Sequence, residues 1–236
     1  MSPQLGFSTG TLHKTKLRLR EQIAVIRSVG CRAVEIGCVK MESFLSKDLD
    51  ELEEIDFTGF EYVSFHAPKF NYGDPGTKYI LNRIKRLQGK IGRPFDLVVV
   101  HPDSIRNTQI FINSELKIGL ENMDSRKSSY RTVVELEFIL EVCPGTSFVF
   151  DVNHAFSNDP TMRLAKDFIT VLGSHISQVH LSGYAGSHEP LFETKQVELI
   201  KTIQNLNVPV IVESVLTLQN ISKEYDYILQ HLCGPK

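Results

Sequence analysis

The sequence predicts a single α/β domain folded as a (β/α)8 TIM barrel, and three observations lead to this prediction. The chain has 236 residues, which suits one sizeable domain better than two small ones. Eight short apolar, β-branched runs recur along its length, with helically spaced segments between them. Runs such as Leu97–Val100 are continuously apolar, which is typical of parallel strands covered on both faces. Eight strand–helix units in one domain-sized chain favour a closed barrel over residues 1–236.

The predicted strands are Leu5–Ser8, Ala33–Gly37, Tyr62–His66, Leu97–His101, Ile118–Glu121, Phe148–Asp151, Gln178–Leu181 and Val208–Glu213. A doubly wound open sheet is the structural alternative, but it usually has fewer strands. The Gly-rich fingerprint of such a sheet is also missing, because the segment Gly6–Thr11 does not have the glycine spacing of a dinucleotide-binding or P-loop motif.

The predicted helices are Leu17–Val29, Tyr79–Ile91, a small one around Thr108–Glu115, Thr132–Leu140, Leu164–Leu172 and Val197–Leu206. Gly30 follows the first of them at the position where a left-handed residue commonly ends a helix. Pro209 follows the last one, as expected before a new strand.

Composition excludes several classes of protein. The hydrophobic fraction of 42% argues against wholesale disorder, and a net charge of −2 argues against a globally basic nucleic-acid binder. No apolar run approaches the length of a membrane span, and the first residues show no secretory signal. The four cysteines form no CxxC pair, which favours buried thiols in a reducing compartment. We therefore expect a cytoplasmic protein without membrane partners; the sequence does not indicate its oligomeric state.

Potential metal ligands stand at the carboxyl ends of six successive predicted strands, where TIM barrels build their active sites. They are His66, His101, Glu121, Asp151, His180 and Glu213. His154 lies three residues past Asp151, at the start of the sixth loop, and His188 lies in the seventh loop. Each alone has an ordinary interpretation, as an interior histidine or a helix N-cap, but together they predict one metal-binding mouth.

This donor set of imidazoles and carboxylates without thiolate suits Zn²⁺, Mn²⁺ or another divalent transition metal. One zinc ion needs three or four protein ligands, so eight candidates predict two or three ions. Glu121, near the middle of the set, is the natural bridging carboxylate.

The motifs around these residues resemble those of AP endonuclease family 2, which includes endonuclease IV and belongs to the xylose-isomerase-like TIM barrels. The motifs are Val63-Ser64-Phe65-His66, Val99-Val100-His101-Pro102, Gly119-Leu120-Glu121-Asn122, Asp151-Val152-Asn153-His154-Ala155-Phe156, Val179-His180-Leu181 and Val212-Glu213.

The resemblance implies a zinc cluster. His66, His101 and Glu121 match the first site, and a bridging Glu121 with Asp151, His180 and Glu213 matches the second. His154 and His188 match ligands of a third site, but Gly186 stands where the family has an aspartate. We therefore expect two firmly held ions and a weaker third one, unless Glu189 or water replaces the missing ligand.

Two enzymatic functions fit this site. The first is metal-dependent hydrolysis of phosphate esters, with damaged DNA or a small phosphorylated molecule as substrate and Glu121 positioning the attacking water. The alternative is a sugar or sugar phosphate isomerase or epimerase that uses one divalent ion and moves a proton with Glu121 and Glu213. His66 and His101 discriminate between them, because only the hydrolase needs both. Lys69, Phe70 and Tyr72 in the third loop are candidate substrate contacts.

Overall fold

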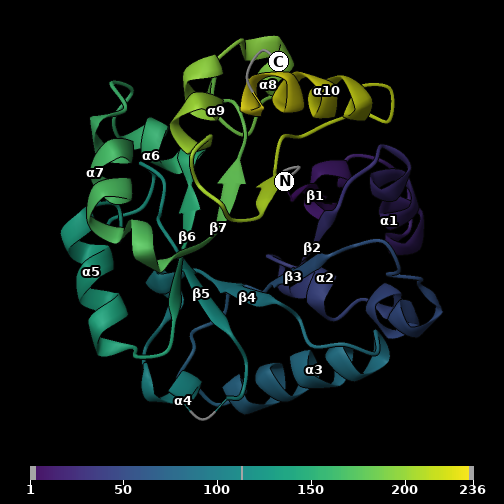
Figure 1. Ribbon diagram of the computed structural model, residues 1–236. Coiled ribbons are helices and arrows are strands. Elements are labelled where there is room, and N and C mark those ends of the chain that lie inside the picture. The colour runs from purple at the N-terminus through teal and green to yellow at the C-terminus, as the bar shows by residue number, and fades with distance from the viewer. Residues whose placement is uncertain (1–3, 113, 234–236) are drawn as a thin grey trace.

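Eight parallel strands close into a barrel in the order β1 to β8 (Figure 1). The computed structural model describes residues 4–112 and 114–233; residues 1–3, 113 and 234–236, which the single-domain prediction includes, lie outside the described residues. The strands are β1 Leu5–Ser8, β2 Ala33–Gly37, β3 Tyr62–His66, β4 Leu97–Val100, β5 Ile118–Glu121, β6 Ser147–Asp151, β7 Ile176–Leu181 and β8 Val210–Val212. The closed barrel confirms the predicted fold class and rules out the open sheet.

Helices form a ring outside the strands (Figure 1). The α-helices are α1 Leu19–Ser28, α2 Met41–Phe44, α3 Thr77–Lys90, α4 Gln109–Ile112, α5 Val133–Val142, α6 Val152–Asn158, α7 Arg163–Leu172, α8 Leu191–Thr194, α9 Val197–Ile203 and α10 Ile221–Leu232. The described residues also contain 3₁₀ segments, each between a strand and an α-helix: η1 Thr9–Leu12, η2 Lys47–Glu54, η3 Pro102–Ser104 and η4 Gly173–His175.

Several boundaries differ from the sequence prediction. β8 is shorter than the predicted Val208–Glu213, because Pro209 has no N–H to donate to a sheet ladder. β4 ends at Val100, and Pro102 starts η3 directly after His101. His154, expected in a loop, lies in α6, which begins at once after β6 because the Asp151 side chain accepts a hydrogen bond from the His154 amide. Gly30 ends α1 with φ +88, as predicted.

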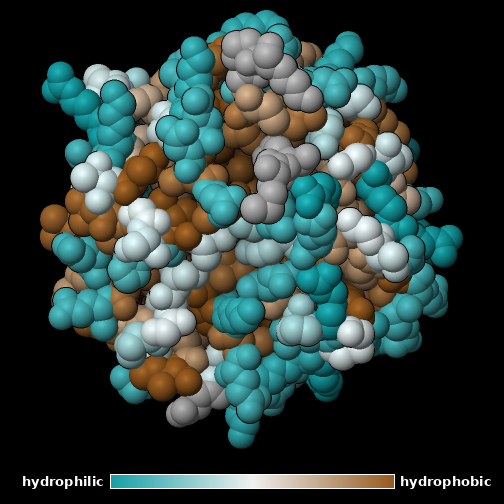
Figure 2. All heavy atoms as spheres, viewed as in Figure 1, coloured by the Kyte–Doolittle hydropathy of each residue, from teal (hydrophilic) through white to brown (hydrophobic). Residues whose placement is uncertain are grey.

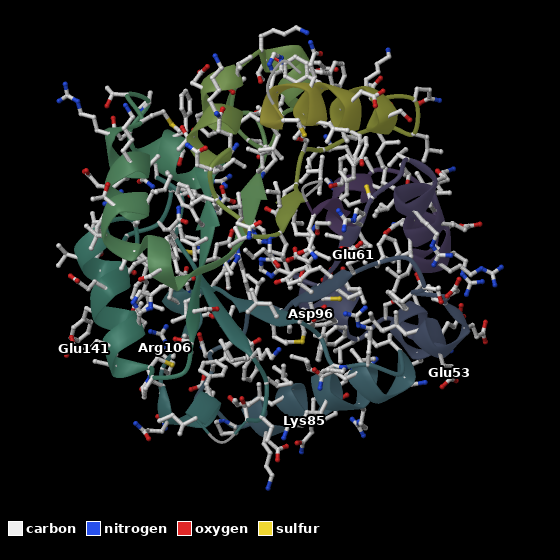
Figure 3. The ribbon with its side chains drawn as sticks, viewed as in Figure 1. Glu53, Glu61, Lys85, Asp96, Arg106 and Glu141 are labelled. Carbon is white, nitrogen blue, oxygen red and sulfur yellow. The ribbon has the colours of Figure 1, made fainter. Side chains whose placement is uncertain are left out.

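The interior of the barrel is stacked in layers because side chains alternate in and out along each strand. Leu97, Val99 and Val149 form a small apolar cluster separate from the main core, which lies between strands and helices. The strand ends that carry the candidate ligands lie at the opposite end from Glu61 and Asp96, which precede β3 and β4 and are labelled near the middle of Figure 3. Asp96 caps β3 there by accepting a hydrogen bond from the Val63 amide.

Apolar side chains are also exposed on the outside of the barrel. Val134 and Phe138 on α5 are 73% and 60% exposed, and Val171 on α7 is 48% exposed. Figure 2 shows apolar atoms gathered on the side of the molecule where α5 and α7 lie. None of the helices in the described ranges is long and apolar enough to cross a membrane.

Candidate metal centre

Strand alternation turns the predicted ligands toward the axis of the barrel. Parallel pairing sets His66 beside Val99 and Asp151 beside His180, so inward-facing positions of neighbouring strands lie side by side. His66, Glu121, Asp151 and His180 are all at most 2% exposed. The structure brings these four residues together at one end of the barrel.

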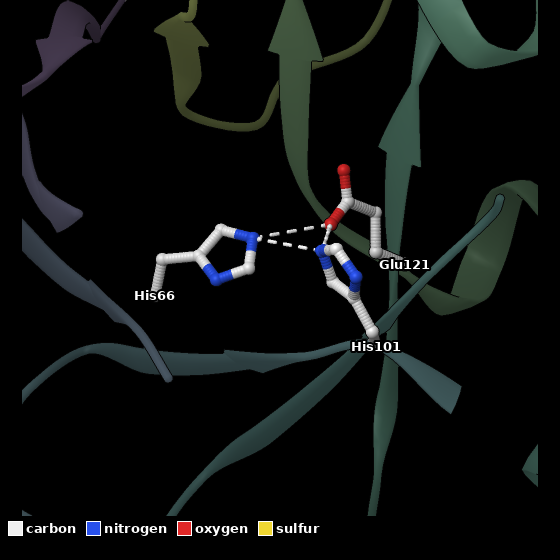
Figure 4. Close-up of side chains that lie close together, drawn as sticks. All are labelled: His66, His101 and Glu121. Carbon is white, nitrogen blue, oxygen red and sulfur yellow. Dashed lines mark hydrogen bonds and ion pairs between the residues drawn. The ribbon is translucent and has the colours of Figure 1, made fainter. Parts of the chain in front are cut away.

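His66, His101 and Glu121 form the first close set (Figure 4). The two Nε2 atoms lie 3.2 Å apart, and Glu121 Oε2 lies 3.3 Å from that of His66 and 3.1 Å from that of His101. Three donor atoms so near one point can hold one cation. Burial lowers the pKa of His101, which favours the neutral imidazole that binds metals.

Glu121, Asp151, His180 and Glu213 form the second close set, with one ligand atom of each within 4.8 Å of the others. His180 Nδ1 lies 3.1 Å from Glu121 Oε1 and 3.7 Å from Glu213 Oε1. Glu121 therefore directs Oε2 toward the first set and Oε1 toward the second. This is the arrangement of a carboxylate that bridges two ions.

Asp151 combines two roles that the sequence left as alternatives. Its Oδ1 caps α6 by accepting from the His154 amide at 2.8 Å, while its Oδ2 is buried and makes no hydrogen bond. A buried carboxylate oxygen without a donor is costly unless a cation or proton meets it. Burial, together with the charges of Glu121 and Glu213, raises the pKa of Asp151 to about 7 although nearby His154 lowers it. This orphaned oxygen fits a metal site.

Charge in the cluster is balanced by protons on buried groups. Burial alone would lower the pKa of His180, but the charges of Glu213, Glu35 and Glu121 raise it well above its ordinary value. Burial alone would likewise raise the pKa of Glu121, but His180 and His101 hold it well below 4.5. A divalent cation supplies the same compensating charge, so its binding would release these protons.

His154 and His188 lie beside this centre but belong to none of the close sets found among the described residues. Their rings meet edge to face at 5.6 Å. His154 Nδ1 donates to the carbonyl of Asn122 at 2.8 Å, and His188 Nδ1 lies 3.0 Å from Ser182 Oγ. Because these hydrogen bonds are made by the Nδ1 atoms, neither of them occupies an Nε2 atom, and a weaker third site would require those Nε2 atoms as ligands.

Neither Gly186 nor Glu189 adds a ligand here. Gly186 has φ +128, a conformation that favours glycine, and Glu189 Oε2 accepts hydrogen bonds from the amides of Ala185 and Ser187. The carboxylate nearest to His154 Nε2 outside the two sets is Asp124, at 3.9 Å, and it is paired with Arg126.

The three candidate substrate contacts differ in their exposure to solvent. Lys69 is exposed and lies close enough for its charge to act on His101, and Phe70 is partly buried. Tyr72 is completely buried, and its hydroxyl donates to the carbonyl of Pro68 at 2.9 Å. Its ring packs against Phe70 and Phe111, so Tyr72 stabilises the third loop and presents no face to a ligand.

Sequence reasoning missed a second group of buried polar residues that supports the site. Glu35, Ser64 and Gln178 lie inside the barrel and are all 0% exposed, and Asn122 exchanges two hydrogen bonds with the backbone of Asp151. A charged residue in the middle of the apolar run Ala33–Gly37 was the signal that could have found Glu35.

Comparison with known proteins identifies the fold of this chain in solved structures. No protein-family model matches the chain, and no curated protein matches it either. Endonuclease IV from Thermus thermophilus superposes with a TM-score of 0.69 at 15% identity, covering 98% of this chain and 99% of that one. A D-tagatose 3-epimerase-like protein gives 0.68 at 19% identity over 97% of each chain. The chain shares their fold.

A sugar enzyme from E. coli is similar as well. The structure of 3-keto-D-glucoside 4-epimerase matches with a TM-score of 0.65 at 15% identity, covering 96% of this chain and 98% of that chain. At such identities the similarity establishes the barrel fold, which hosts both a nuclease and epimerases. The choice between these activities depends on the residues of the site.

Proposed function

We propose that this protein is a metal-dependent hydrolase of phosphate esters that holds two divalent cations, with Zn²⁺ as the preferred metal. One observation carries the proposal: the two oxygens of Glu121 point into two different ligand sets. His66 and His101 complete the first set, and Asp151, His180 and Glu213 complete the second. In an enzyme that holds one ion in the second set, His66 and His101, whose Nε2 atoms lie 3.2 Å apart, would add nothing to those four ligands.

The residues of the two ligand sets have different roles in phosphate ester hydrolysis. When bound, the two cations would supply Lewis acidity, neutralising phosphate oxygens and lowering the pKa of water. Glu121 holds both ligand sets at a fixed separation because its carboxylate is buried between them. The Glu213 side chain is 17% exposed at the mouth, where it can accept a proton from an incoming water molecule.

Cationic side chains at the mouth suit a phosphorylated substrate. Lys69 is exposed near His101, and Lys127 is paired with Asp103 just beyond it. The fold match to endonuclease IV makes damaged DNA one candidate substrate, and a small phosphorylated molecule is the other. We infer a cytoplasmic enzyme, because its cysteines are free and three of the four are buried, which suits a reducing compartment.

A second candidate is a divalent-metal-dependent sugar isomerase or epimerase. It is favoured by the completeness of the second set, in which Glu121, Asp151, His180 and Glu213 supply four ligand atoms without help from the other histidines. Several solved structures with this fold are described as sugar epimerases or epimerase-like. In this function Glu121 and Glu213 would move a proton on or off the substrate carbon.

Counting metal ions and assaying both reactions tests the proposal. The protein is purified without added metal, saturated with Zn²⁺ or Mn²⁺, freed of excess ion and analysed for metal per chain. It is then assayed on an abasic-site oligonucleotide, a simple phosphodiester and a panel of ketoses. We expect two firmly held ions and cleavage of a phosphate ester. One ion per chain with ketose epimerisation would replace the hydrolase by the epimerase, and no bound ion would refute the metal centre itself.

A further inference from the structure

Beneath the candidate metal centre, one oxygen of a buried glutamate collects three polar contacts. Glu35 Oε2 accepts hydrogen bonds from Ser64 Oγ at 3.1 Å and Gln178 Nε2 at 2.8 Å, and His180 Nε2 lies 3.1 Å away. The other oxygen, Oε1, is buried and makes no hydrogen bond. A glutamate that merely filled the barrel would gain by sharing donors between both oxygens. This carboxylate is instead aimed at His180.

His180 lies between two carboxylates, one at each ring nitrogen. Nε2 faces Glu35, whereas Nδ1 faces Glu121 Oε1 at 3.1 Å inside the second ligand set. A neutral imidazole carries one proton, and the nitrogen that holds it is decided by the hydrogen bond made there. A proton on Nε2, donated to Glu35, leaves the lone pair of Nδ1 facing the metal centre. Gln178 Nε2 donates to the same Glu35 oxygen at 2.8 Å and lies 2.7 Å from His180 Nε2, so the N–H groups of both residues converge on Glu35.

We propose that Glu35 is a positioning residue that holds the proton of His180 on Nε2 and thereby presents Nδ1 to a metal ion. This inference rests on the proposed metal centre and assigns a role to a residue outside both ligand sets. Ser64 pairs with Glu35 in the β2–β3 register and fixes the carboxylate from the side. Because Glu35 and His180 are both 0% exposed, water cannot replace a lost partner.

Two substitutions of Glu35 and one matched control test the inference. Glu35→Leu removes the acceptor, and Glu35→Gln keeps the shape and an acceptor oxygen but removes the charge. Ser64→Ala deletes a different hydrogen bond to the same carboxylate and leaves the contact with His180 in place. The two readouts are the dissociation constant of each bound Zn²⁺ ion and the protonation of His180 Nε2, observed by long-range ¹H–¹⁵N NMR of the loaded protein.

We expect the ion held by the second set to bind roughly 10- to 100-fold more weakly in Glu35→Leu, as for other partners of metal-bound histidines. The downfield Nε2–H signal of His180 should also be lost. Glu35→Gln should retain that signal at a shifted position and show a smaller loss of affinity, and Ser64→Ala should behave like the wild type.

The outcomes separate this inference from the proposed function. If the wild type binds no metal, the metal centre fails and the role of Glu35 fails with it. If the wild type binds metal, unchanged affinity and an unchanged Nε2–H signal in Glu35→Leu overturn the role of Glu35 alone. If Glu35→Leu does not fold, Glu35→Gln decides: wild-type affinity together with a wild-type position of the Nε2–H signal would refute the inference.

Discussion

Replacing His101 with alanine separates the two candidate functions, because His101 belongs to only one of the two sets that share Glu121. The first set consists of three donor atoms separated by 3.1 to 3.3 Å, and the substitution leaves only two. Two protein ligands are fewer than the three that catalytic zinc sites keep. The second set loses none of its four ligand atoms. We therefore expect His101→Ala to retain one ion out of two.

The kinetic consequence follows from the loss of one of two cations that stabilise charge on the phosphate oxygens. We expect phosphate ester hydrolysis to fall about 100-fold or more, equivalent to about 2.7 kcal/mol at 1.36 kcal/mol for each factor of ten. Metal content is measured after dialysis, and hydrolysis is measured at saturating Mn²⁺ or Zn²⁺. His188→Ala is the matched control, because it removes another imidazole from the mouth but lies outside the close sets in the described part of the chain. Ketose epimerisation that survives His101→Ala, with no phosphate ester cleaved by the wild type, would refute the reasoning.

Three further predictions concern the scaffold. Gly6→Ala should destabilise the protein by about 3 kcal/mol in urea unfolding, because its Cβ would lie 1.7 Å from the Ala33 carbonyl oxygen; exposed Gly89→Ala in α3 should instead stabilise it by about 0.5 kcal/mol. Glu135→Gln should cost only about 0.3 kcal/mol above pH 4.5, because glutamine can also accept in the capping box and solvent screens the lost charge; the native box lowers the pKa of Glu135 from 4.5 against the effect of burial. That cost should vanish as the pH falls through the lowered native pKa, and a cost that persists in acid would contradict it. Tyr72→Phe should lose about 1 kcal/mol of stability with an unchanged KM, whereas a large rise in KM would return Tyr72 to the substrate site.

Much of the barrel could be predicted because each strand can be recognised from a short run of mostly apolar residues in the local sequence. Runs such as Ala33–Gly37 and Tyr62–His66 begin and end where the sequence predicts, since a strand covered on both faces is mostly apolar along its length. The predicted boundaries were wrong where a hydrogen bond made or lost at a single residue sets the end of an element. Asp151 starts α6 by capping it, and Pro209 shortens β8, so both ends depend on hydrogen bonds made or lost at one residue.

The sequence by itself determined the order of the strands and of six helices between them, but not α10, and it determined which strand ends carry His, Asp or Glu. Only the tertiary structure decided how those side chains meet, because closing the barrel converts separate strand ends into one inward-facing ring. The direction of each Glu121 oxygen, the orphaned oxygen of Asp151 and the burial of Tyr72 follow from that packing. Glu35 shows the difference most clearly. In the sequence it is one acid in an apolar strand, and only closure of the barrel brings its oxygen to Nε2 of His180, 145 residues away.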